Sequence, residues 1–168
     1  SMVNKYTANK RQRHDDAYTA DARPGMRPDY PSIVYTQILK KLYPDVPVVL
    51  GGIEASMRRL SHYDYWEDRL RPCILCESGA DMLIYGMGEK PIVALADAMN
   101  EGKNIHEVEG IPQTVYLRKQ EDLQITDNDI QLASYEDCLK DRKKQSQNFK
   151  YIEEESNKWT ANRILQKT

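Results

Sequence analysis

Two short apolar runs that each end in glycine constrain the fold of this chain most. The first run, "VVLGG" at 48–52, is followed by "IEASMRRL", and the second, "MLIYGMG" at 82–88, is followed by "EKPIVALADAMN". Short, continuous β-branched runs are typical of strands buried on both faces of a sheet. Glycine followed by apolar residues at helical spacing indicates a strand-to-helix turn. The sequence therefore predicts two parallel strands, each followed by a helix.

The segments around these two units extend the pattern. Residues 30–43 carry apolar side chains at helical spacing, with Asp29 as the expected N-cap. Short helices are expected over 54–60 and 89–100, "CILC" at 73–76 fits either a strand or a helix, and "QTVYLRK" at 113–119 alternates like an edge strand. We therefore expect an α/β fold with a partial, Rossmann-like parallel sheet and flanking helices. Only three or four strands are predicted, whereas doubly wound sheets usually have about five or six, which suggests the second half of a larger domain.

Composition divides the chain into three predicted segments. Residues 1–28 are polar and too poor in apolar side chains to fold alone, residues 29–119 hold the α/β pattern, and residues 120–168 are strongly charged. Ser134 and Asp137 have the spacing of a capping box, so we expect one or two long helices in the charged C-terminal segment. A thin apolar seam is expected along them, formed by Tyr135, Cys138, Leu139, Phe149, Ile152, Trp159 and Leu165.

Overall charge and cysteine content exclude several classes of protein. The formal net charge is −2, which gives no reason to expect nucleic acid or an anionic membrane as a partner. No apolar run approaches the roughly 18 residues of a membrane span. The basic N-terminus lacks the apolar core of a secretory signal. Three cysteines, an odd number, fit a reducing compartment, so a cytoplasmic protein is expected.

The two glycine turns are the candidate ligand site. Ligands of open α/β sheets bind at the carboxyl ends of the strands, where glycine lets backbone N–H groups approach an anion closely. A ligand that carries a phosphate or a carboxylate would contact Gly51, Gly52, Ser56, Gly86 and Gly88. The alternative is that such turns need glycine anyway, since neither matches a dinucleotide fingerprint or a P-loop. Glu54 and Glu89 would also repel an anion there.

The stretch "RRLSHYDYWEDRLR" at 58–71 is a candidate interface, because aromatic rings among charges often form one. Its expected contact residues are Arg58, Arg59, His62, Tyr63, Tyr65 and Trp66, and the alternative is a surface loop held by weak ion pairs. Cys73 and Cys76 have redox or zinc spacing, but two small buried residues account for them better. No motif identifies a catalytic or a metal-binding residue.

Long parts of the sequence resemble the N-terminal region of the YgiQ-type radical SAM proteins, a large, uncharacterised bacterial family. The resemblance rests on "NKYTANKRQRHDDAYTADARPGMRPDYPSIVYTQ", on "VPVVLGGIEASMRRLSHYDYWEDRLRPCILCESGADMLIYGMGEKPI" and on "TANRILQK". More loosely, "VVLGGIEAS", "ADMLIYGMGE" and "GIPQTVYL" are similar to the second half of the cobalamin-binding-like domain that precedes many radical SAM barrels. The resemblance implies that 29–119 is such a half-domain and that 120–168 is a linker or arm toward a barrel.

The resemblance also implies cofactors for the parent protein. A separate barrel with a C-x-x-x-C-x-x-C motif would bind a [4Fe–4S] cluster and S-adenosylmethionine. That motif is absent here, as is the D-x-H-x-x-G signature of base-off cobalamin binding. We therefore assign no cofactor, metal ligand or catalytic residue to this chain.

Two functional hypotheses follow. The first is an accessory domain of a radical SAM enzyme that is not catalytic alone and whose partner is the barrel of the same parent chain. The alternative is a free-standing α/β module that binds a ligand or a protein. Self-association through an exposed sheet edge or through the Tyr/Trp-rich stretch is a further expectation.

Overall fold

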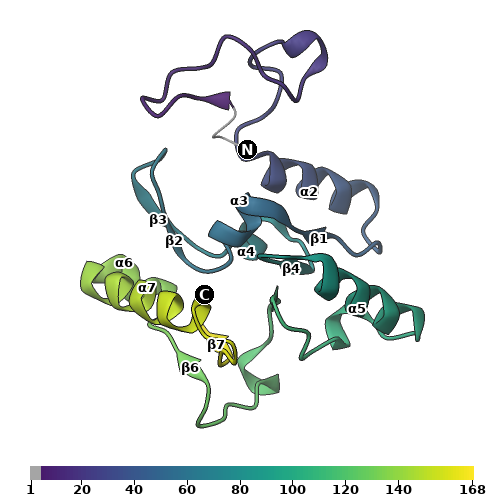
Figure 1. The fold of residues 1–168 in the computed structure, drawn as a ribbon, viewed down its shortest axis with the longest axis vertical. Helices are drawn as coiled ribbons and strands as arrows, with labels where there is room; N and C mark the ends of the chain where they lie inside the picture. The colour runs from purple at the N-terminus through teal and green to yellow at the C-terminus, as the bar shows by residue number, and fades with distance from the viewer. Residues whose placement is uncertain (1–4) are drawn as a thin grey trace. The chain divides into compact units, whose positions relative to one another are not determined.

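The computed structural model of the chain describes residues 5–168 and has a mixed α/β architecture (Figure 1). Its residues form two compact units that are discontinuous in sequence. Unit 1 comprises the described residues up to Arg59 together with Ile74–Leu117, and unit 2 comprises Leu60–Cys73 and Arg118–Thr168. The division into 1–28, 29–119 and 120–168 stays a prediction, and its first four residues lie outside the described ones.

Unit 1 contains a three-stranded sheet in the order β1-β4-β5. β1 (Val49–Leu50) and β4 (Met82–Ile84) are parallel, as the glycine-terminated runs predict. β5 (Thr114–Val115) pairs antiparallel with β4, with Leu83 opposite Val115. The sheet is therefore mixed, and the expectation of a parallel sheet holds for β1 and β4 but not for β5. The chain runs from α5 to β5 through residues 101–113, which include the 3₁₀ turn at Ile105–Glu107.

Four α-helices belong to unit 1. They are α2 (Pro31–Leu42), α3 (Gly52–Met57), α4 (Ile74–Ser78) and α5 (Glu89–Asn100); one 3₁₀ turn, Ala20–Ala22, precedes α2 and another, Ile105–Glu107, follows α5. The helices predicted at 30–43 and 89–100 are confirmed, and "CILC" is mainly helical from Ile74 onward. A cluster of buried apolar side chains joins β4 to α5 and to the segment after it through Met82, Ile84, Leu95, Ile105 and Val108.

Two details of unit 1 differ from the sequence expectations. β1 is only half-buried, not buried on both faces, because among the described residues it pairs on one side alone, with β4. The N-cap of α2 is Tyr30, in the left-handed region at φ 53°, and not Asp29. Asp29 instead accepts hydrogen bonds at 2.8 Å from both Lys5 Nζ and the Tyr6 hydroxyl. A charged partner is a stronger attraction for a carboxylate than a helix N–H group.

Unit 2 contains a β-hairpin, a small parallel pair of strands and two helices. The hairpin joins β2 (His62–Asp64) to β3 (Arg69–Arg71), and β6 (Ile130–Gln131) pairs in parallel with β7 (Ile164–Leu165). The helices are α6 (Tyr135–Lys140) and α7 (Arg142–Ser156), and a 3₁₀ turn spans Gln120–Asp122. The Ser134 hydroxyl accepts the N–H of Asp137 at 3.0 Å, as the predicted cap requires.

The C-terminal segment is thus less helical than expected. Helix covers 135–156 but not the residues on either side, where β6 and β7 lie. The expected apolar seam is also incomplete, since Cys138 is buried whereas Leu139, Phe149 and Trp159 are exposed. Asn148 occupies the interior instead, where its amide nitrogen donates to the Ala133 carbonyl and its amide oxygen accepts the Ala133 N–H, both at 2.9 Å. In the part of the chain that the structure describes, no helix is long and apolar enough to span a membrane.

Candidate functional site

The structure brings the two glycine turns of unit 1 together. Gly51 and Gly52 follow β1, and Gly86 and Gly88 follow β4, so both turns lie at the carboxyl ends of neighbouring parallel strands. The Ser56 hydroxyl connects the two turns. It donates to the Gly52 carbonyl at 2.9 Å within α3 and accepts the Gly86 N–H at 3.2 Å. The five predicted ligand residues therefore form one contiguous edge of the sheet.

The same hydrogen bonds limit what this edge can offer to an anion. The Gly86 N–H, one of the groups that would cradle a phosphate, is already occupied by Ser56. α3 has only six residues, so its dipole is small. Gly88 caps the longer helix α5 with ordinary right-handed backbone at φ −80°. The Ser56 hydrogen bonds therefore fit a structural link between the two turns at least as well as the turns fit a phosphate-binding site.

Charged groups beside the turns are engaged within unit 1. Glu54 accepts a hydrogen bond from the Ser32 hydroxyl of α2 at 2.8 Å and lies 3.9 Å from a guanidinium nitrogen of Arg58. Arg59 donates to the Ser56 carbonyl at 2.6 Å, and its guanidinium lies 4.9 Å from the centre of the Tyr85 ring. Glu54 is therefore directed toward α2, and Arg59 supplies a cation at the glycine edge.

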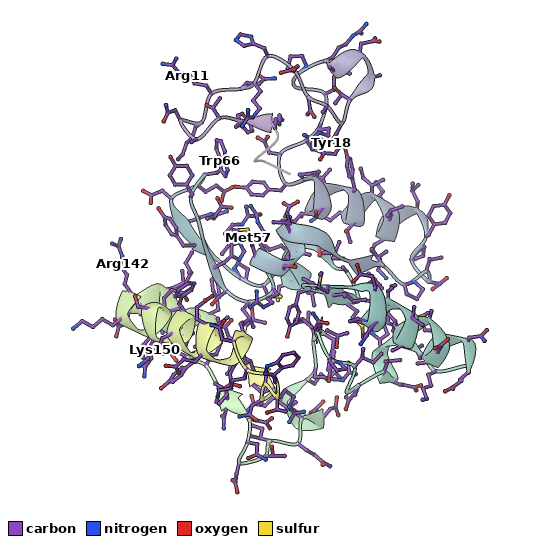
Figure 2. The ribbon with its side chains drawn as sticks, in the orientation of Figure 1. Arg11, Tyr18, Met57, Trp66, Arg142 and Lys150 are labelled. Carbon is purple, nitrogen blue, oxygen red and sulfur yellow. The ribbon has the colours of Figure 1, made fainter. Side chains whose placement is uncertain are left out.

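Three large apolar side chains surround the glycine turns and are exposed. Ile53 and Met57 of α3 and Met87 between the two glycines of the second turn have relative exposures of 79%, 72% and 76%. Figure 2 labels Met57 on α3. Sequence reasoning missed this apolar patch. The signal was present, because Ile53 and Met57 are four residues apart on one short helix and a methionine between two glycines has little to pack against.

The predicted interface residues are divided between the two units. Arg58 and Arg59 belong to unit 1, where the Arg58 guanidinium lies 4.7 Å from the centre of the Tyr30 ring. His62, Tyr63, Tyr65 and Trp66 belong to the hairpin of unit 2. An interface role for either set stays a prediction.

The hairpin is more than a loose surface loop. Buried Asp64 accepts the N–H of Trp66 at 2.8 Å, which closes the turn. The rings of Tyr65 and Trp66 meet edge to face, 6.1 Å between centroids. The Tyr63 hydroxyl donates to Asp68, and this carboxylate raises the pKa of the tyrosine. Local hydrogen bonds thus fix the aromatic residues of the turn.

The cysteines do not form a site for an iron–sulfur cluster. Cys73 and Cys138 are buried thiols of unit 2, whereas Cys76 is an exposed thiol of unit 1. The buried Cys138 thiol accepts a hydrogen bond from the Asn148 amide at 3.2 Å, and burial raises its pKa. Within residues 5–168, no group of three or more His, Cys, Asp or Glu side chains could hold a metal ion. Cys73, Cys76 and Cys138 also lack the C-x-x-x-C-x-x-C spacing of a radical SAM cluster motif.

A shallow hollow in unit 1 lies along α5, away from the glycine turns. It is lined by α5 and by residues 101–111, with acidic side chains at its rim. None of the predicted ligand residues contributes to it.

Comparison with known proteins assigns the family. Residues 1–168 match the family described as "Radical SAM N-terminal". The chain belongs to this family. The resemblance to a radical SAM N-terminal region is therefore confirmed.

Individual members of the family are close in sequence. The chain is 61% identical to a UPF0313 protein of Bacteroides thetaiotaomicron and 57% identical to one of Porphyromonas gingivalis, in each case over 99% of this chain. A UPF0313 protein of Clostridium botulinum is 42% identical over 93% of it. The chain spans only about a quarter of these relatives, 28%, 26% and 24% of their lengths. No solved structure matches the chain.

Proposed function

We propose that residues 1–168 are an accessory domain of a radical SAM enzyme and are not catalytic alone. The observation that carries the proposal is the family match over the whole chain, together with relatives that are about four times as long. The catalytic barrel, with its [4Fe–4S] cluster and S-adenosylmethionine, would lie in the part of the full-length protein outside these residues. The thiols of this chain are unsuited to such a cluster, which supports that assignment.

The glycine edge of unit 1 is the surface through which the domain would act. Its residues Gly51, Gly52, Ser56, Gly86 and Gly88 would contact a ligand or the barrel at the carboxyl ends of β1 and β4, the edge at which open α/β sheets bind ligands. The exposed apolar patch of Ile53, Met57 and Met87 supports contact with another surface, because clustered apolar side chains usually mark an interface. The sheet would be the second half of a Rossmann-like, cobalamin-binding-like domain, and the protein would be cytoplasmic.

The test compares the 168-residue chain with the full-length protein. Both are reconstituted anaerobically with iron and sulfide, and metal content is measured beside reductive cleavage of S-adenosylmethionine. We expect no bound iron on the short chain and about four irons per cluster on the full-length protein. The proposal is overturned if the short chain binds stoichiometric iron that is lost in the Cys73→Ser, Cys76→Ser variant, or if the full-length protein binds none.

A second comparison tests the glycine edge itself. Met57→Lys in the full-length protein should slow cleavage of S-adenosylmethionine or lower the thermal midpoint of unfolding. The reason is that the substitution places a charge in the proposed contact between the glycine edge and the barrel. Met26→Lys is the matched control, since Met26 is similarly exposed but lies outside the glycine edge. Equal effects of the two substitutions would refute a contact at the glycine edge.

A further inference from the structure

A second exposed apolar surface of unit 1 lies on α2. The helix buries Pro31, Ile33 and Thr36, and it contacts α4. Its opposite side is also apolar. Tyr35, Ile38, Leu39 and Leu42 have exposed fractions between 44% and 63%. Their offsets of three, four and seven residues place them on one stripe. A helix that is apolar on two sides is normally covered on both.

The open edge of β1 is the second observation. Among the described residues β1 pairs only with β4, through Val49 opposite Met82 and Leu50 opposite Leu83. Natural proteins protect open sheet edges with charges, prolines or a covering segment. The strand run from Val48 to Leu50 has neither charge nor proline, and its residues are half-buried. The open edge of β1 can therefore pair with a further strand.

Lys40, on the inner side of α2, pairs with Asp81, which directly precedes β4 on the paired side of β1. Lys40 Nζ lies 3.1 and 2.9 Å from the two carboxylate oxygens of Asp81. Asp81 also accepts the Val48 N–H at 2.7 Å. α2 leads into β1 in the chain, and a helix before a parallel strand is the usual crossover of a strand–helix–strand unit. Among residues 5–168, no strand before α2 belongs to this sheet.

We propose that a strand-bearing segment of the same polypeptide, outside residues 1–168, pairs with the open edge of β1 and covers the outer stripe of α2. The stripe and the edge together then become interior surface of one larger sheet domain. The length of the relatives supports this occupant, because roughly three quarters of each lies outside the matched region. The inference rests on the proposed function only in assuming a longer chain of this family.

Hydroxyl-radical footprinting and hydrogen exchange test the inference on the 168-residue chain and on the full-length protein. Oxidation of Tyr35, Ile38, Leu39 and Leu42 should fall at least several-fold in the full-length protein. The amides of 48–50 should exchange more slowly there. Equal oxidation and exchange in the two proteins would overturn the inference.

Substitutions give an independent readout. Leu42→Gln should leave the thermal midpoint of the short chain unchanged and lower that of the full-length protein by several degrees. Lys41→Gln, the neighbouring exposed position, should change neither. If the short chain is instead a dimer in which this stripe is protected, and Leu42→Gln makes it monomeric, a second copy is the occupant and the inference is wrong.

The metal measurement separates this inference from the proposed function. A protected stripe on a full-length protein without iron would refute only the radical SAM assignment. A full-length protein with its cluster but with an unprotected stripe would refute only the covering segment.

Discussion

Gly51 and Gly52 are adjacent and both lie in the proposed ligand edge, yet their substitution by alanine should change the stability of the protein in opposite directions. Gly51 has extended backbone at φ −148° and ψ −177°, which any residue adopts. Gly52 has φ +83°, in the left-handed region. A Cβ at Gly51 would lie 3.9 Å from the Ile84 carbonyl oxygen, an ordinary contact, and one at Gly52 would meet nothing within 4 Å. Backbone conformation is thus the main difference between the two substitutions.

The expected difference in stability follows from comparing the two substitutions. Replacing either glycine by alanine lowers the conformational entropy of the unfolded chain by a similar amount. This effect stabilises the folded protein by about 0.4–1 kcal/mol. Only Gly52→Ala also places a side chain in left-handed backbone, at a cost of about 1–2 kcal/mol. Because the unfolded-state contribution cancels in the comparison, Gly52→Ala should be about 1–2 kcal/mol less stable than Gly51→Ala. For a chain of this size the two midpoints should differ by about 2–8 °C.

Circular dichroism during thermal and urea unfolding is the appropriate assay. Both tryptophans, Trp66 and Trp159, belong to unit 2, so tryptophan fluorescence would report on the wrong unit. Hydrogen exchange of the peptides that contain β1 and β4 would localise the loss. The reasoning is refuted if Gly52→Ala unfolds at the same temperature as Gly51→Ala or above it.

Three further predictions concern stability. Arg163 donates to both carboxylate oxygens of Asp129, at 2.9 and 2.7 Å, and holds the pKa of that carboxyl well below its ordinary 3.8. The stability that this ion pair contributes is present above about pH 4 and is lost as the pH falls further. Arg163→Gln should therefore weaken the dependence of unfolding on acid pH, measured by tryptophan fluorescence. Asn148→Ala should cost about 1–3 kcal/mol in urea unfolding because it removes the partner of the partly buried Ala133 N–H, whereas exposed Lys150→Ala should cost less than about 1 kcal/mol. Leu83→Ala, at a fully buried position of β4, should cost about 2–5 kcal/mol in the same assay followed by circular dichroism.

Elements that depend on local spacing could be predicted from the sequence. The apolar period of α2 and α5 and the glycines that end β1 and β4 all act within a few residues of one another, so the structure confirms them. Their parallel pairing also follows from the intervening helices. Because the turns then meet at one edge, the proximity of Gly51 and Gly86 was predictable as well.

Features that depend on distant partners could not be predicted. β6 and β7 are two residues each and pair across 34 positions, with Ile130 opposite Ile164, so neither leaves a periodic signal. Asp29 satisfies every local criterion for an N-cap, yet its side chain binds Lys5, 24 positions away. The engagement of Arg59 by Tyr85 likewise depends on the fold.

The exposed apolar surface of unit 1 explains why the short chain and the full-length protein should respond differently to the same substitution. Side chains such as Met57 at the glycine edge and Leu42 on α2 are exposed in the short chain, so changing them removes little buried area and costs little. Once another segment covers them, the same atoms leave water, and each buried side chain gains about 1.5–3 kcal/mol. Measurements on the short chain alone would therefore classify these positions as neutral. The difference in effect between the two proteins, rather than either effect alone, identifies a residue as part of an interface.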